Sequence, residues 1–172
     1  LEFGRVAVSS GVIPDWRVNR LLVHLLFDAD ARARSDFDRL PRRFRAIAAD
    51  LADGSQVVLA RGDLARAVRV SMSTPGFFAA MAWDGRLLSD GGIADYLPVS
   101  VARALGAGRV VAVDVSRAPL GIRRTDPTAI GGRSISLLMR NALPDTLPPD
   151  VLISPAIDPD FPGAVFPERP RL

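Results

Sequence analysis

The sequence predicts an α/β fold, built as a partial three-layer α/β/α sandwich whose sheet is mainly parallel with hairpin additions. Three observations favour this class. Apolar strand-like segments alternate with helical segments that carry start and stop signals. Two Asp-Gly pairs each separate two apolar segments, as in β-hairpins. The segment 109–116 is a continuous, valine-rich apolar run, which is typical of a strand buried on both faces.

The first half of the chain contains two predicted helices and two predicted strands. A helix begins after Pro14 and Asp15 and continues to about residue 35. Its apolar stripe consists of Val18, Leu21, Leu22, Leu25, Leu26 and Ala29. A strand over 44–50 turns at an Asp-Gly pair into a second strand over 56–60. Asp63 is the expected N-cap of the second helix, over 64–73, which ends before a proline.

The second half continues the alternation. Segments 77–83 and 86–89 flank Asp84-Gly85 as a hairpin-like pair. A helix over 98–105 begins at Pro98 and ends at Gly106. We expect the strand over 109–116 to share a sheet with the strand over 44–50. A helix-like patch follows at 134–143, and a last strand lies within 150–158.

Length and composition indicate one domain over residues 1–172. A chain with 48% hydrophobic residues and a net charge of +3 can bury a core of ordinary size. No stretch of 18 uncharged apolar residues occurs, so no membrane-spanning helix is predicted. Residues from about 158 to 172 are rich in proline and are expected to form a loop-like tail.

The residue inventory excludes several kinds of site. The chain has no cysteine, and all 22 basic residues are arginine. Disulfides, thiolate zinc sites, a cysteine nucleophile, a Schiff-base lysine and a P-loop lysine are therefore excluded. His24, the single histidine, lies off the apolar stripe and is expected to be a partly exposed structural residue, so no metal site is predicted. The arginine-rich stretch 32–45 also contains aspartates and is interpreted as a solvated helix end and loop, with contact to anionic lipid headgroups as the alternative and no nucleic-acid partner.

Two further motifs are interpreted as structural. The glycines of "GAG" at 106–108 follow a helix and precede a strand, whereas a dinucleotide-binding loop has the opposite order. No G-x-S-x-G nucleophile elbow occurs in the chain. The serines of 9–11 and 71–73 lack that pattern and are expected in a turn and at a helix C-terminus.

Asp90 is the remaining candidate for chemistry. It ends an apolar run and is followed by Gly91 and Gly92. One interpretation is a tight turn. The other is a carboxylate presented at the carboxyl end of a strand, where α/β folds place their sites, with the glycines allowing φ > 0 or close backbone approach. An aspartate in that position can act as a general base towards a hydroxyl group.

The order of these motifs resembles the patatin family of serine lipid acyl hydrolases, and in particular the bacterial patatin-like phospholipases. The resemblance rests on "DFDRLPRRFRAIAADLADGSQVVLARGDLARAVRVSMSTPGFF" (36–78) and on "WDGRLLSDGGIADYLPVSVARALGAGRVVAVDVS" (83–116). It extends more weakly through "PPDVLISPAID" (148–158) and "DFP" (160–162).

The resemblance implies a function and a site. Asp90, Gly91 and Gly92 match the family's D-G-G/A motif, whose Asp serves as the base of a Ser–Asp dyad, and Pro98 matches the proline that trails the motif. Asp95 stands where asparagine is common, a departure that affects local hydrogen bonding. Ser71 and Pro75 match positions where we expect packing roles. The implied activity is hydrolysis of phospholipid or acylglycerol esters, with no cofactor.

The nucleophilic serine and the glycine-rich oxyanion loop of the family are missing from this sequence, which resembles the C-terminal half of a patatin domain. The resemblance therefore implies that the upstream half of the domain is a partner, and that this chain alone is inactive. A lipid substrate, a membrane surface, and a bacterial cytoplasmic or peripheral-membrane location are expected, with secretion or an outer-membrane link as the alternative location. The alternative function is a non-catalytic fragment or lipid-binding pseudoenzyme half. The sequence preceding Leu1 discriminates between the two, since an in-frame G-x-S-x-G after a glycine-rich loop favours the hydrolase.

Overall fold

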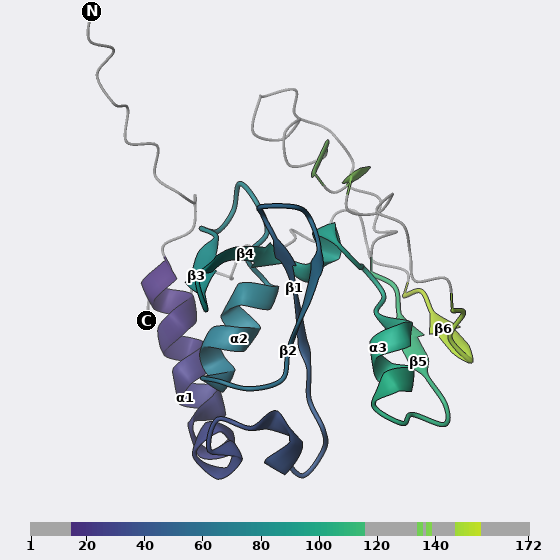
Figure 1. Cartoon of the computed structure of the whole chain (residues 1–172), viewed down its shortest axis with the longest axis horizontal. Helices are drawn as coiled ribbons and strands as arrows, with labels where there is room; N and C mark the ends of the chain where they lie inside the picture. The colour runs from purple at the N-terminus through teal and green to yellow at the C-terminus, as the bar shows by residue number, and fades with distance from the viewer. Residues whose placement is uncertain (1–14, 116–133, 136, 139–146, 156–172) are drawn as a thin grey trace, which may run out of the picture.

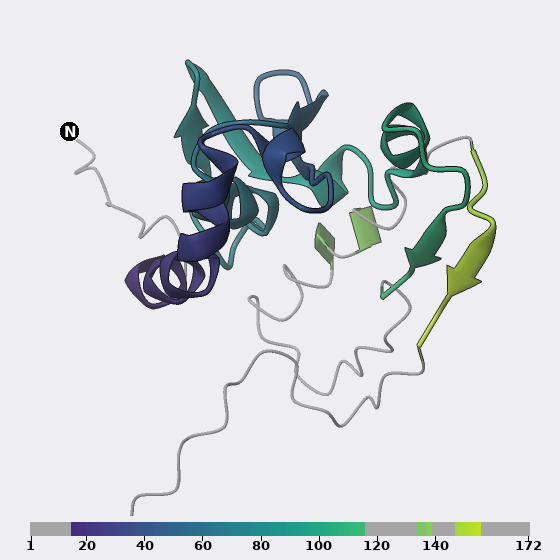
Figure 2. The same cartoon turned by 90° about the horizontal axis from the view of Figure 1, so that it is seen from below.

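The structure, a computed structural model, describes residues 15–115, 134–135, 137–138 and 147–155. The helical elements are α1 (Asp15–Ala33), η1 (Phe37–Arg39), α2 (Leu64–Ser71), η2 (Gly91–Ile93) and α3 (Val99–Ala104), where η marks a short 3-10 helix. The strands are β1 (Ala46–Asp50), β2 (Gln56–Leu59), β3 (Met81–Trp83), β4 (Arg86–Asp90), β5 (Val111–Val113) and β6 (Val151–Ile153). Figures 1 and 2 show two groups: a four-stranded sheet with α1 and α2, and a smaller group of α3, β5 and β6 beside it. The predicted α/β class is confirmed.

The larger sheet has the strand order β2-β1-β4-β3, and every neighbouring pair in it is antiparallel. The expectation of a mainly parallel sheet is therefore wrong for these four strands. The reason lies in the short connections, because a parallel pair needs a long crossover whereas a tight turn joins antiparallel strands. Between β3 and β4 the turn residues Asp84 and Gly85 both have positive φ, 46° and 79°, as the favoured two-residue hairpin requires.

One helical layer covers this sheet. The Asp63 carboxylate accepts a hydrogen bond from the Arg66 backbone N–H at 2.7 Å and starts α2 as predicted. The helix α2 packs on β1 and β4, and α1 packs on α2. The core between them consists of Ala33, Phe37, Ala46, Ala48, Leu59, Leu64, Ala67, Val70 and Leu88. This layer is the part of the expected α/β/α sandwich that the described residues contain.

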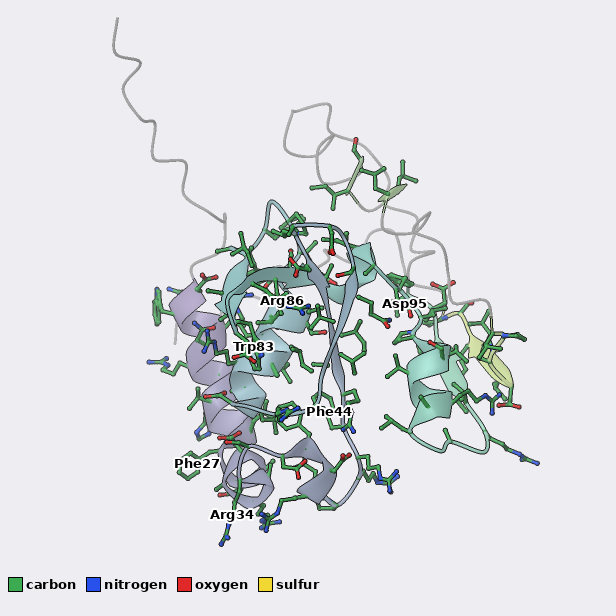
Figure 3. All side chains as sticks on the ribbon, in the orientation of Figure 1. Phe27, Arg34, Phe44, Trp83, Arg86 and Asp95 are labelled. Carbon is green, nitrogen blue, oxygen red and sulfur yellow. The ribbon has the colours of Figure 1, made fainter. Side chains whose placement is uncertain are left out.

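The helix α1 is apolar over more of its circumference than α2 covers. Leu22 and Leu26 are partly buried, but Leu21 and Leu25, which the sequence places on the same stripe, are exposed. Phe27 is 68% exposed and points away from the sheet in Figure 3. A helix with apolar residues on several sides is typical of a buried position.

The smaller group differs from its prediction in two ways. The strand β5 pairs in parallel with β6 in a separate two-stranded sheet, so the expectation that segments 44–50 and 109–116 share a sheet is wrong for the described residues. Val111 and Val113 are exposed while Ala112 is buried, so β5 is not covered on both faces. The apolar run was correctly interpreted as a strand, but its neighbours depend on tertiary contacts that periodicity does not report.

The remaining predicted elements agree with the structure within a few residues, except that β3 is shorter than segment 77–83. The four described residues of patch 134–143 are helical. The other residues of that patch and the tail at 158–172 lie outside the described residues. Within the described part of the chain, no helix has the length and apolar character needed to cross a bilayer.

Candidate functional site

Asp90 is the last residue of β4 and lies opposite Ala48 of the central strand β1. Its backbone N–H donates to the Ser73 carbonyl at 3.3 Å. Its Oδ1 accepts a hydrogen bond from the Gly92 N–H at 2.9 Å, which makes Asp90 the N-cap of η2. Its Oδ2 accepts a hydrogen bond from the Thr74 hydroxyl at 2.6 Å. The carboxylate is therefore held at the end of a strand by one donor on each oxygen.

The need for glycine after Asp90 arises from close approach. Gly91 is buried, and a Cβ at this position would lie 2.3 Å from the Ile47 carbonyl oxygen of β1. Neither Gly91 nor Gly92 has positive φ. Of the two reasons that the sequence offered for the pair, close backbone contact therefore applies and a left-handed turn does not.

The residues that follow α2 are fixed to the end of β4. The Ser73 carbonyl accepts the Ser89 hydroxyl at 2.7 Å as well as the Asp90 N–H. The Ser73 hydroxyl, fully buried, accepts from Arg69 Nη1 at 2.8 Å and donates to the Arg69 carbonyl at 2.9 Å. Ser73 and Ser89 therefore use their hydroxyls in internal hydrogen bonds.

Arg69 is the largest fully buried side chain in the described residues. Its guanidinium forms an ion pair with Asp15 at the start of α1 and lies over the Phe78 ring at 4.4 Å. Burial of a guanidinium requires partners of this kind, since an unpaired buried charge is costly. Arg69 thus connects α1 and the segment after α2 to the end of β4.

The segment after Asp90 is held by a second carboxylate. Asp95 is 8% exposed and accepts a hydrogen bond from the Gln56 amide of β2 at 2.7 Å. Its backbone N–H donates to the Gly91 carbonyl at 2.9 Å. Figure 3 shows Asp95 between the four-stranded sheet and α3. Pro98 follows as the residue that caps the start of α3, one position before the helix, rather than as its first residue.

Tyr96 lies in the electrostatic field of Asp90 and of a second carboxylate, Asp114. Burial, followed by the negative charges of Asp114 and Asp90, raises the pKa of the Tyr96 phenol. Asp114 is 7% exposed and follows β5, where its backbone N–H donates to the Ile153 carbonyl at 2.8 Å. A neutral phenol therefore lies near two carboxylates at the ends of β4 and β5.

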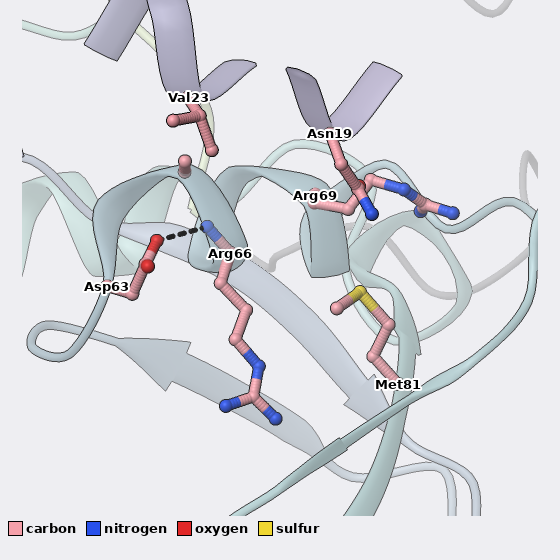
Figure 4. Close-up of a pocket in the computed structure, with 7 residues that line it drawn as sticks. Asn19, Val23, Asp63, Arg66, Arg69 and Met81 are labelled. Carbon is pink, nitrogen blue, oxygen red and sulfur yellow. Dashed lines mark hydrogen bonds between the residues drawn. The ribbon is translucent and has the colours of Figure 1, made fainter. Parts of the chain in front are cut away.

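Among the described residues, some surface cavities do not include Asp90. One, of about 220 Å³, lies between α1 and α2 near β3 and is shown in Figure 4. Its Asp63 and Arg66 already serve as a helix cap and as a donor to the Ala82 carbonyl. Another is lined by Trp16, Arg17, Arg20, Leu21 and His24 on α1. His24 is exposed, as predicted.

The structure places Asp90 at the end of β4, Gly91 and Gly92 in η2, and Pro98 directly before α3. Sequence reasoning misses Thr74, Tyr96 and Asp114. Asp114 had an available signal, since it is the one acidic residue in the apolar strand predicted over 109–116. Thr74 had none, because its contact with Asp90 depends on how α2 and β4 pack. In the part of the chain that the structure describes, no group of three or more acidic or histidine side chains could hold a metal ion.

Comparison with known proteins identifies the family to which this chain belongs. The family model of patatin-like phospholipases matches residues 15–103, just over half of the chain. An uncharacterized NTE family protein of Mycobacterium bovis is 34% identical over 104 residues, which cover 60% of this chain and 29% of that protein. Another, of Mycobacterium tuberculosis, is 39% identical over 80 residues, covering 46% of this chain and 14% of that protein.

A mammalian protein also matches this chain. The mouse patatin-like phospholipase domain-containing protein 7 is 43% identical over 72 residues, covering 41% of this chain and 5% of that protein. This chain therefore spans less than a third of the length of each of these relatives. The matched range includes Thr74, Asp90, Gly91, Gly92 and Pro98.

Proposed function

This chain belongs to the patatin-like phospholipase family, and from that membership we propose that the protein containing it hydrolyses lipid acyl esters, with Asp90 as the base of a Ser–Asp dyad. The observation that carries the proposal is the Asp90 carboxylate, held at the end of β4 within the matched range. The substrate class is phospholipid or acylglycerol, and no cofactor is needed for the chemistry.

The proposed reaction has two halves. The nucleophilic serine attacks the ester carbonyl carbon while Asp90 takes its hydroxyl proton. The tetrahedral intermediate collapses, the carbon–oxygen bond to the lipid alcohol breaks, and Asp90 returns the proton to that oxygen. Water then attacks the acyl-serine and gives a proton to Asp90. Collapse of the second intermediate releases the fatty acid, and Asp90 returns the proton to the serine oxygen.

The serine and the oxyanion donors are proposed to come from the upstream half of the domain. Two serines beside Asp90 support this division, because Ser73 and Ser89 are buried and hydrogen-bonded internally. This supports a nucleophile that another segment supplies. Donors for the tetrahedral oxyanion supply a large share of the rate enhancement in acyl transfer, so both parts are required for turnover.

The experiment that tests this function uses the whole protein. Fatty acid release is measured from phospholipid and acylglycerol vesicles, and the protein is treated with a fluorophosphonate that labels activated serines. We expect turnover and one labelled serine per chain, at a G-x-S-x-G upstream of Leu1. Vesicle binding without release or labelling would instead identify the lipid-binding pseudoenzyme.

A further inference from the structure

The carboxylate of Asp90 has a side-chain donor that the D-G-G motif does not contain. Thr74 Oγ1 lies 2.6 Å from Asp90 Oδ2, and the Gly92 N–H lies 2.9 Å from Oδ1. One donor on each oxygen fixes the plane of the carboxylate. A carboxylate has about four acceptor sites, so one site on each oxygen remains for a serine hydroxyl or a water molecule.

Thr74 is itself held in place. Its carbonyl accepts the backbone N–H groups of Phe77 at 3.1 Å and Phe78 at 3.0 Å, and its own N–H donates to the Met72 carbonyl at 2.9 Å. The preceding residue, Ser73, is fixed to β4 and to the buried Arg69. The hydroxyl of Thr74 therefore approaches Asp90 from a backbone that is hydrogen-bonded on both sides.

The Thr74 hydroxyl is the side-chain donor to the Asp90 carboxylate, so a substitution can remove it. The Gly92 N–H is a backbone donor close in sequence and fixes only Oδ1. Without a donor on Oδ2, the carboxylate can turn about its Cβ–Cγ bond, whose torsional preference is broad. A base must lie within hydrogen-bond reach of the proton that it removes, and displacements of about 1 Å can cost about 100-fold in rate.

We propose that Thr74 is a positioning residue that orients the Asp90 carboxylate towards the nucleophile. This inference rests on the proposed function and adds to it a specific hydroxyl donor, supplied by the segment after α2. In this role Thr74 acts through its hydrogen bond to Asp90.

The test compares two substitutions in the whole protein. Thr74→Val keeps the shape of the side chain and removes the donor, whereas Thr74→Ser keeps the donor and removes the methyl group. We expect Thr74→Val to lower kcat by about 10- to 100-fold, with KM for vesicle substrate within about twofold of the unmodified protein. Thr74→Ser should keep at least about a third of kcat, as the same orientation argument requires. Rates are expressed per folded molecule from the amplitude of the melting curve.

Asp90→Asn is measured beside them, so that the two proposals can fail separately. If Asp90→Asn abolishes turnover while Thr74→Val keeps full kcat, the role of Thr74 is overturned and the dyad stands. Equal loss in Thr74→Val and Thr74→Ser overturns it as well, since the methyl group and not the donor would then matter. If Asp90→Asn keeps full turnover, both proposals are overturned.

Discussion

At the residue scale, the close contact between Gly91 and β1 fixes the position of Asp90. The backbone of η2 passes so near Ile47 that a Cβ at Gly91 would lie 2.3 Å from a carbonyl oxygen. Such a distance requires the backbone to shift, because real Cβ atoms do not approach oxygen so closely. The position of the Asp90 carboxylate thus depends on the lack of a side chain at the next residue, Gly91.

We therefore expect Gly91→Ala to destabilise the fold by about 1–3 kcal/mol or more, the usual range for overpacking. Gly108→Ala is the matched control, because a Cβ there meets no atom within 4 Å and its φ is not positive. Thermal melting of the two variants checks this. Equal melting temperatures would show that β1 and η2 are not in contact.

Tyr96 offers a second test at this scale, since it is the only tyrosine in the chain. Its phenol should ionise above the ordinary pKa of 10.0, because burial and the charges of Asp114 and Asp90 oppose ionisation. Because the pKa of Tyr96 is raised in the folded state, the contribution of the neutral phenol to the stability of the fold is complete below pH 10. That contribution is lost as the pH rises through the raised pKa. Absorbance at the phenolate band follows the titration.

Asp114→Asn should move that midpoint down, and Asp90→Asn should move it down by a smaller amount, because Asp114 has the larger effect. A midpoint at the ordinary value in the folded chain would contradict the placement of Tyr96 near the two carboxylates.

The candidate site illustrates what sequence can and cannot predict for individual residues. Asp90 is predictable because a strand, an aspartate and two glycines are adjacent in sequence. Thr74 is not, because sixteen residues and a β-hairpin separate it from Asp90, and only the packing of α2 against β4 brings the two together. The sequence shows that Asp95 stands where asparagine is common in the family. It does not identify the hydrogen-bond partner of Asp95, because Gln56 lies on a strand 39 residues earlier.

At the scale of elements, local sequence signals were sufficient to predict helix ends and the hairpin. They did not predict which strands pair. The Asp63 cap, the Asp84-Gly85 turn and Gly106 each act within a few residues, so the helix start, the hairpin and the helix end were predicted. The partner of β5 depends on a contact with β6, about 40 residues later, and was not predicted. Sheet membership requires tertiary information that a hydrophobic period does not contain.

Asp150 connects the elements of the smaller group. Its carboxylate accepts the Val110 N–H at 2.7 Å and pairs with Arg103 of α3 at 2.6 Å. The Val110 hydrogen bond, and then Arg103, lower the pKa of Asp150. The carboxylate thus joins β6, β5 and α3.

We expect Asp150→Asn to weaken this group at neutral pH. A lowered pKa in the folded state means that the stabilising contribution is present above the ordinary pKa and is lost as the pH falls through the lowered value. Hydrogen exchange at the Val110 amide should therefore be faster in the variant at pH 7, after correction for intrinsic exchange, and the two proteins should converge as the pH falls below about 3.8. Equal protection at pH 7 would show that the contact is absent.

At the scale of the whole molecule, the described fold leaves apolar surface uncovered. Leu21, Leu25 and Phe27 of α1 are exposed, as are Val111 and Val113 of β5. Patches of this kind mark surfaces that another structure covers. Composition and alternation predicted the α/β class, whereas the extent of each layer depends on segments packed against it, which this sequence does not specify by local pattern.

The most direct test of the proposed dyad is the turnover of Asp90→Asn per folded molecule in the whole protein. Asparagine keeps the size of the side chain and an oxygen that can accept from Thr74 or Gly92, but it cannot take the proton of the serine. The dyad predicts a loss of about 10²- to 10⁴-fold in kcat, with a melting temperature close to that of the unmodified protein. An unchanged rate per folded molecule together with a lower melting temperature would contradict it, since Asp90 would then serve only to fix the turn at Gly91 and Gly92.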